Sequence, residues 1–145
     1  MSDVVVERSS AHLARGSLAR LLHALAAMHR LVADSDFAHP KWLPELAPGA
    51  RSTHLIAIHG EEMAGFLAGR PHDGHIALIG SLRPGVGIGA ALVEAFAHHA
   101  TAAGTPQLSA VIDTEATRRW QRRKFLENNG FRLLEGSALH FVRQL

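Results

Sequence analysis

The chain has 145 residues, of which 47% are hydrophobic and 19% charged, a composition typical of one globular domain and too apolar for a disordered chain. It contains no cysteine, which excludes disulfides, thiolate metal sites and a cysteine nucleophile. Its formal net charge of +2 does not indicate nucleic-acid binding, and no apolar run reaches the roughly 18 residues of a membrane span.

The first third of the chain predicts a strand, a helix and an irregular segment. Residues 4–7 read Val-Val-Val-Glu, a β-branched run typical of a strand. Between Leu13 and Val32, apolar residues recur at steps of three and four, which predicts an amphipathic helix. Residues 37–52 carry three prolines at four-residue spacing, so a long helix is excluded. This segment is a connector or the border of a binding site. The start of the chain lacks the pattern of a secretion signal, so we expect a cytoplasmic protein.

Residues 54–82 predict an antiparallel meander. The runs 54–59, 63–70 and 75–82 are rich in Ile, Leu, Ala and Phe and are separated by Gly60-Glu61-Glu62 and Pro71-His72-Asp73-Gly74. Short apolar runs between glycine-containing turns are typical of hairpins.

The remaining residues switch to alternating helices and strands. The predicted elements are a helix over 90–103, a strand over 108–113, a helix over 114–129 that Gly130 ends, and a hairpin of strands 132–135 and 139–143. A strand, a helix and a strand in succession predict a right-handed parallel crossover. We therefore expect one α/β (α+β) domain over 1–145: a mixed, mostly antiparallel sheet flanked by helices, with one parallel βαβ crossover.

The sequence between strand 75–82 and the following helix is rich in glycine, at Gly85, Gly87 and Gly89. Glycine permits positive φ and a close approach to the main chain, and the first turn of a helix leaves N–H groups unpaired and partly positive. Such a junction suits a phosphate or pyrophosphate; a tight turn made for packing is the alternative. The predicted anion-binding backbone comprises Gly85, Val86, Gly87, Ile88, Gly89 and Ala90.

A dinucleotide site is one alternative for this turn. Gly85-x-Gly87-x-x-Ala90 also fits the G-x-G-x-x-A pattern of NAD(P)-binding domains, with Asp113 at a suitable distance for a ribose. However, four predicted strands precede the turn and only about 55 residues follow it, too few for the remaining parallel strands.

Two motifs in this order resemble the GNAT N-acetyltransferase superfamily. Its Q/R-x-x-G-x-G/A turn falls on Gly87 and Gly89, and its downstream F-Y-E-x-x-G-F corresponds to the segment 125–131, Phe-Leu-Glu-Asn-Asn-Gly-Phe. The order of predicted elements is also similar, so the resemblance covers essentially the whole chain. Two positions depart from the pattern: Pro84 stands in place of Gln or Arg, and Leu126 in place of the tyrosine that serves many members as general acid.

The resemblance implies an acetyl-CoA-dependent N-acetyltransferase that moves an acetyl group to a primary amine of a small molecule or peptide. It implies that the backbone of Ala77, Leu78 and Ile79 binds the pantetheine arm and supplies an N–H donor, with the strand 108–113 on the other side. An inactive acyl-CoA-binding or regulatory protein is the alternative, because the chain has no tyrosine. A homodimer is the expected oligomer.

The general base is not determined by a motif. His75 lies, by the two-residue period of a strand, on the face of Ala77 and Ile79, and histidine titrates near neutrality. His75 lies four residues from Ile79 in the chain, about 13 Å along a strand, so a water would have to relay the proton. The competing residues are Glu61, Glu62, His72, Asp73 and Asp113. The histidine spacings indicate no metal site.

Overall fold

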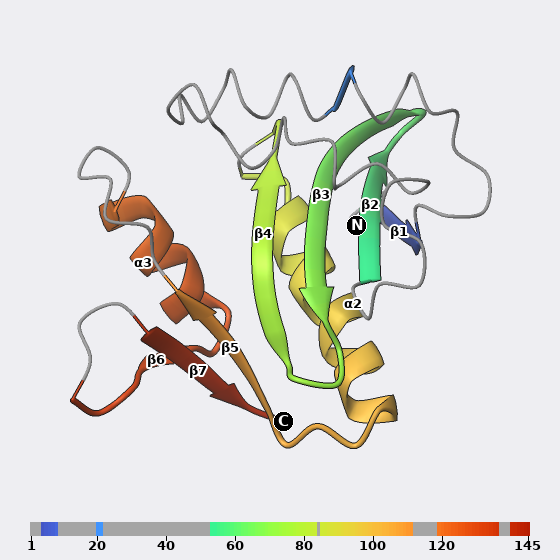
Figure 1. The fold of residues 1–145 in the computed structure, drawn as a ribbon. Coiled ribbons are helices and arrows are strands. Elements are labelled where there is room, and N and C mark those ends of the chain that lie inside the picture. The colour runs from blue at the N-terminus through green and yellow to red at the C-terminus, as the bar shows by residue number, and fades with distance from the viewer. Residues whose placement is uncertain (1–3, 9–19, 22–52, 84, 112–118, 137–139) are drawn as a thin grey trace.

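The computed structural model describes residues 4–8, 20–21, 53–83, 85–111, 119–136 and 140–145. Within this part of the chain, seven strands form one sheet in the order β1-β2-β3-β4-β5-β7-β6 (Figure 1). The strands are β1 (Val4–Arg8), β2 (Thr53–His59), β3 (Glu62–Arg70), β4 (His75–Ser81), β5 (Gln107–Val111), β6 (Arg132–Leu133) and β7 (His140–Gln144), and the helices are α2 (Ile88–Ala102) and α3 (Arg119–Asn128).

The structure describes little of the two segments predicted after the first strand. Of the helix expected between Leu13 and Val32, only Arg20 and Leu21 are described, and both are helical. The proline-containing segment 37–52 lies outside the described residues.

The pairing of the strands confirms a mixed, mostly antiparallel sheet. Strands β1 to β4 pair with their neighbours in antiparallel register, β4 pairs with β5 in parallel, and β7 pairs antiparallel with both β5 and β6. The parallel pair is joined through α2, which is the predicted crossover. A dinucleotide-binding domain requires several parallel strands, so this sheet does not fit the NAD(P) alternative.

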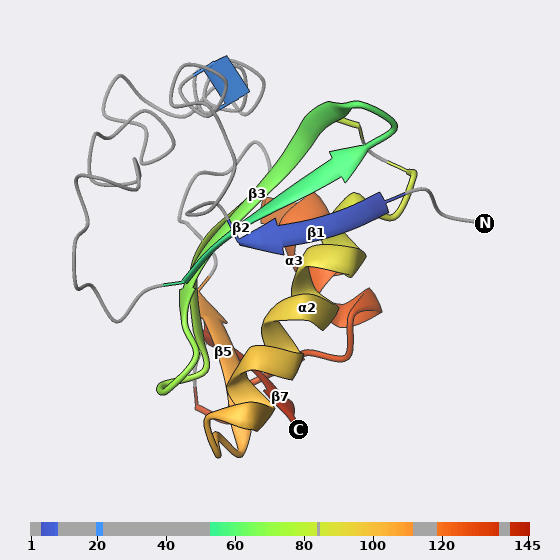
Figure 2. The same ribbon diagram turned by 90° about the vertical axis from the view of Figure 1, so that its right-hand side faces the viewer.

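Helices α2 and α3 cover one side of the sheet, which we call the helix face (Figure 2). The fully buried side chains Leu92 and Phe96 of α2 join Leu55 and Leu67 of the central strands in one apolar core. Burying each such side chain contributes about 1.5–3 kcal/mol. On the other side of the sheet, which we call the opposite face, Phe66 is also completely buried. The sheet is therefore packed on both sides, and α2 is held firmly against its centre.

The helix α2 begins two residues earlier than the predicted Ala90, because Gly87 adopts the left-handed conformation (φ +84°) and serves as its N-cap. The glycine-rich turn is therefore short and runs directly into the helix. Downstream, α3 ends as its sequence predicts: the N–H of Gly130 (φ +87°) donates to the carbonyl of Glu127, and the N–H of Phe131 donates to that of Leu126. These two bonds form a Schellman motif, with buried Leu126 and Phe131 beneath it.

Candidate functional site: the gap between two parallel strands and the glycine turn

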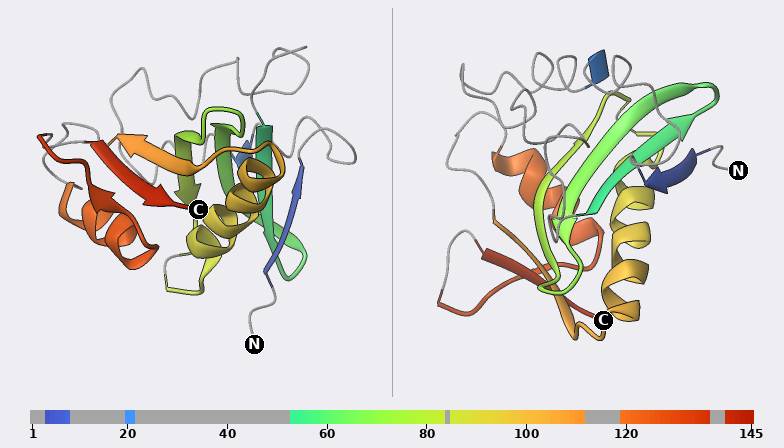
Figure 3. Two further views of the ribbon diagram at one scale, coloured as in Figure 1. Left: turned by 90° about the horizontal axis from the view of Figure 1, so that it is seen from below. Right: turned by 45° about the vertical axis from the view of Figure 1, so that its right-hand side comes forward.

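The strands β4 and β5 pair over only two residues. Their ladder comprises His75 with Ser109 and Ile76 with Ala110, although β4 continues for five further residues to Ser81. The two strands then separate, as Figures 1 and 3 show. The register with β3 shifts at this point, between Ala68 and Gly69, which marks a bulge in β4 at Ala77. A bulge increases the local twist of a strand and so directs β4 away from β5.

The upper part of β4 presents backbone groups to this gap. The N–H of Leu82 donates to the carbonyl of Ala64 at 2.7 Å, and the register from there to Leu78 is regular. Because backbone groups alternate between the two edges of a strand, Leu78 directs its N–H and C=O to β3. Ile79 and Ser81 direct theirs to the gap. The backbone of Leu78 therefore already pairs with Ala68 in β3, whereas Ser81 shares the gap edge with Ile79.

The glycine turn lies at the end of β4, above the gap. Gly85 (φ +85°) and Gly87 (φ +84°) both need the left-handed region, and among the described residues nothing lies within 4 Å of a Cβ built on either. The first intrahelical bond runs from Ala91 N–H to Gly87 C=O at 3.0 Å. The N–H groups of residues 88–90 therefore precede the helical ladder. No described side chain caps this terminus, and its first turn carries no acidic residue, so the positive end of the helix dipole is not neutralised there.

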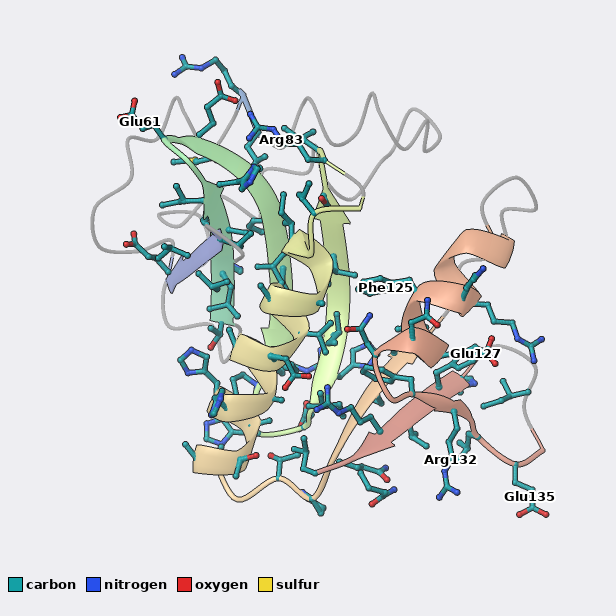
Figure 4. All side chains as sticks on the ribbon, turned by 180° about the vertical axis from the view of Figure 1, so that it is seen from behind. Glu61, Arg83, Phe125, Glu127, Arg132 and Glu135 are labelled. Atoms are coloured by element: carbon teal, nitrogen blue, oxygen red, sulfur yellow. The ribbon has the colours of Figure 1, made fainter. Side chains whose placement is uncertain are left out.

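Gly89 differs from the other two glycines, because it provides space rather than a special φ. A Cβ at Gly89 would lie 2.6 Å from Cε1 of Phe125 in α3, and a Cβ at Gly65 in β3 would lie 2.5 Å from Cγ2 of Ile88. Figure 4 shows Phe125 pointing from α3 toward β4 and the start of α2. The packing alternative therefore holds for Gly89, and the two contacts fix the beginning of α2 between β3 and α3.

Arg83 anchors the chain just before the glycine turn. Its Nη1 lies 2.8 Å from Nδ1 of His59 and 3.4 Å from the carbonyl oxygen of the same residue, and its Nη2 forms an ion pair with Glu62. Because a guanidinium only donates, His59 must accept at Nδ1. Arg83 thus ties the turn to the β2–β3 hairpin (Figure 4), a role that its position in the sequence did not indicate.

Arg143 connects the elements on the helix face. It donates to both carboxylate oxygens of Glu94 in α2, at 2.7 and 3.3 Å, and to the carbonyl of Asn129 at the end of α3. The hydrogen bond and the charge of Arg143 lower the pKa of Glu94. This bridge from β7 to both helices holds α3, and with it Phe125, beside the glycine turn.

His75 lies at the point where β4 and β5 part, but on the opposite face. Ile76 is buried in the core and Ile79 packs against it from the same side. The bulge between these residues reverses the alternation, so His75 does not share a face with Ile79 as the two-residue period predicted. Its Nδ1 lies 3.0 Å from Oγ of Ser109. Burial, and to a smaller extent the charge of Arg70, lowers the pKa of His75 below 6.5.

The residues that compete with His75 as general base lie at the turns. Glu61 is exposed in the β2–β3 turn, and exposed Glu62, the first residue of β3, is paired with Arg83. Asp73 accepts from Nε of Arg70 at 2.7 Å in the β3–β4 turn, beside exposed His72. Asp113 lies outside the described residues. Among the described candidates, His75 is the one that belongs to the β4–β5 ladder, at the start of the gap.

Neither a metal centre nor a membrane span is present in the part of the chain that the structure describes. No three histidine or acidic side chains there come together as a metal site. None of the described helices is long and apolar enough to cross a membrane.

Solved structures with the same fold are acetyltransferases. The chain aligns over its whole length with an acetyltransferase from Thermus thermophilus, which it covers completely, at 20% identity and a TM-score of 0.72. It aligns over 98% of its length with 99% of a GNAT-family acetyltransferase from Staphylococcus aureus, at 13% identity and a TM-score of 0.72. It covers 96% of an aminoglycoside 6′-N-acetyltransferase complexed with coenzyme A, with 97% of its own length, at 14% identity and a TM-score of 0.71.

The chain therefore has the fold of the GNAT acetyltransferases. No family model matches the sequence, and no curated protein matches it either.

Proposed function

We propose that this protein is an acetyl-CoA-dependent N-acetyltransferase acting on a primary amine. The observation that carries the proposal is the gap between β4 and β5, with the glycine turn and the start of α2 at its upper end. The coenzyme A complex among the structures of this fold supports the choice of carrier.

The residues around the gap fit coenzyme A. The open glycines Gly85 and Gly87, with the N–H groups of residues 88–90, provide backbone donors for a pyrophosphate. The edge of β4 at Ile79 and Ser81 provides donors and acceptors for the amides of a pantetheine arm. Exposed Val86, at the tip of the turn, brings no charge to the phosphates. Backbone groups therefore take the place of the Gln or Arg side chain that the family pattern has at position 84.

When bound, acetyl-CoA supplies the acetyl thioester. The N–H of Ile79, on the gap edge of β4, is placed to donate to the carbonyl oxygen as negative charge develops there. The helix face beside this strand is filled by Ile79 and Phe125, so the amine approaches from the opposite face. His75 lies on that face, is neutral at pH 7 because of its lowered pKa, and accepts a proton from the amine through water.

The leucine at the motif position in α3 cannot donate a proton to the departing thiolate. Leu126 occupies the position of the family's tyrosine and is 6% exposed within the core. A thiolate leaves more readily than an amine or an alkoxide, because a thiol has a pKa of about 8.5. Water is therefore sufficient as its proton donor. An acyl-CoA-binding protein without turnover is the second candidate, favoured by this same buried leucine.

A binding screen followed by a turnover assay tests the proposal. Thermal shift and calorimetry with CoA, acetyl-CoA and NAD should show binding of the first two alone. Thiol release from acetyl-CoA should then appear with at least one member of a panel of small-molecule amines, polyamines, amino acids and peptides. Binding of CoA without release on any amine supports the second candidate, and the absence of CoA binding refutes both.

A further inference from the structure

The hydrogen bond between His75 and Ser109 joins the two strands where the gap begins. These residues are direct partners in the β4–β5 ladder, and only one further pair follows before the strands separate. Nδ1 of His75 and Oγ of Ser109 are 3.0 Å apart and partly buried. This polar pair lies on the opposite face, at the start of the gap.

We propose that Ser109 is a positioning residue for the acetyl transfer: its hydroxyl accepts from Nδ1–H of His75 and leaves the lone pair of Nε2 directed toward the amine. This inference rests on the proposed function. It assigns Ser109 a role that no motif of the sequence indicated.

Two features of the geometry favour this role. The bulge at Ala77 puts His75 on the face from which the amine approaches, whereas a regular strand would have placed it behind the gap. The pairing of β4 with β5 fixes the backbone of both residues, so the hydrogen bond also fixes the ring. In a neutral imidazole, one nitrogen donates and the other accepts, and a serine hydroxyl can do either. With the hydroxyl accepting from Nδ1–H, as proposed, Nε2 carries the lone pair that can accept a proton.

The charged groups around His75 come from three further elements. Arg70 at the end of β3 opposes protonation, and its ion pair with Asp73 in the adjoining turn partly offsets that effect. His140 at the start of β7 also opposes protonation of His75. These groups act on the protonation of the ring through their charge. The hydrogen bond to Ser109 acts on its orientation.

The chemical step balances with one proton carried by His75. The amine nitrogen forms a bond to the thioester carbon, the carbon–sulfur bond breaks, and its electron pair leaves on sulfur as a thiolate. The proton that the nitrogen loses passes through water to Nε2, while Nδ1–H keeps its hydrogen bond to Oγ of Ser109. Solvent then protonates the thiolate and removes the proton from His75, which restores the starting state.

Four variants test the proposal. His75→Gln removes the base, Ser109→Ala removes the acceptor, and Ser109→Thr keeps a hydroxyl. Gln107→Ala is the matched control, because Gln107 lies two residues earlier on β5, points to the same face and makes a side-chain bond to Gln144 at 2.9 Å instead.

Enzyme kinetics gives the first readout. For kcat, we expect a loss of about 100-fold or more in His75→Gln and a smaller loss of about 3- to 10-fold in Ser109→Ala, the usual effect of one hydrogen bond. Ser109→Thr should recover kcat, and Gln107→Ala should leave it unchanged. The KM for acetyl-CoA should stay within about twofold in all four variants. In the wild-type protein kcat/KM should decrease as the pH is lowered. This decrease should be absent in His75→Gln and remain in Gln107→Ala.

Nitrogen-15 NMR tests the hydrogen bond even if no amine is turned over. The chain has eleven histidines, and the signals absent from His75→Gln identify its ring. In the wild-type protein this ring should be the Nδ1–H tautomer, and Ser109→Ala should shift it toward Nε2–H. A wild-type Nε2–H tautomer overturns the proposal, and so does a Ser109→Ala variant with unchanged spectrum and kcat. Failure of the thiol-release assay with the expected tautomer present instead counts against the proposed function alone.

Discussion

Substituting Gly87 with Glu and, separately, with Gln tests whether the glycine turn binds the phosphates. Gly87 has φ +84°, and no atom of the described residues lies within 4 Å of a Cβ built on it. Both side chains therefore impose the same backbone strain, about 1–2 kcal/mol, and nearly the same bulk. Only the charge differs. The pair separates electrostatics from folding, and thermal unfolding should give the same Tm for both variants.

The expected difference in affinity follows from Coulomb's law. A carboxylate on residue 87 would lie about 6 Å from a phosphate held by the N–H groups of residues 88–90, which at an effective dielectric constant of about 20–80 corresponds to about 0.7–3 kcal/mol of repulsion per unit charge. Gly87→Glu should therefore bind CoA about 3- to 150-fold more weakly than Gly87→Gln at low salt. At about 0.5 M salt the difference should shrink by more than half, because such charges are then screened.

Isothermal titration calorimetry with CoA at low and high salt measures this difference. The control is the same pair of substitutions at Gly136, which has φ +82° and similarly open surroundings in the β6–β7 turn, away from the start of α2. There, Glu and Gln should bind CoA alike. If Gly87→Glu and Gly87→Gln bind CoA equally at low salt while both are folded, the phosphates do not sit on this turn and the reasoning is wrong.

Three further predictions concern stability and its dependence on pH. Gly74 has φ +72°, and a Cβ there would collide with a backbone oxygen of β5, so Gly74→Ala should lower the free energy of unfolding by about 3 kcal/mol or more. Gly60 has φ +68° and no described atom within 4 Å, so Gly60→Ala should lower it by about 1–2 kcal/mol. Equal losses of unfolding free energy in urea would contradict the steric argument. Burial lowers the pKa of His54 below 6.5, so the unfolded chain binds more protons and stability falls as the pH drops below 6.5. His54→Leu should reduce that slope between about pH 7.5 and 5, and an unaltered slope would show that His54 does not contribute. A double-mutant cycle of Arg143→Gln and Glu94→Gln should give a coupling of about 0.5 kcal/mol at neutral pH, modest because Glu94 is 57% exposed. Since the pKa of Glu94 is lowered from 4.5, the coupling should be present above that pH and disappear as the pH falls through the folded-state pKa; a coupling that persists in acid would contradict the assignment.

The strands and their order along the chain could be predicted because their signals are local. Apolar runs, turn glycines and the αL terminator at Gly130 each act within a few residues, and the structure confirms the elements that they predict. The place of β7 between β5 and β6 could not be predicted in this way. The sequence of a hairpin shows that two strands pair, but not which of them joins the rest of the sheet.

The candidate site was predictable in its composition but not in its geometry. Gly87 and Gly89 look alike in the sequence, yet the first requires positive φ and the second makes room for Phe125, which belongs to a different helix. The bulge at Ala77 has no sequence signal, and it decides the face on which His75 lies. Ser109 was overlooked because its role depends on the β4–β5 register, which only the folded chain shows.

The position of β7 between β5 and β6 has a consequence for biosynthesis. This strand, residues 140–144, supplies the partner of β5 and carries the arginine that bridges α2 and α3. During translation, β5 must therefore wait with an unpaired edge until these residues have left the ribosome exit tunnel. A ribosome that stalls before codon 140 would leave a nascent chain with an open β-strand, which invites pairing with other chains and binding by chaperones.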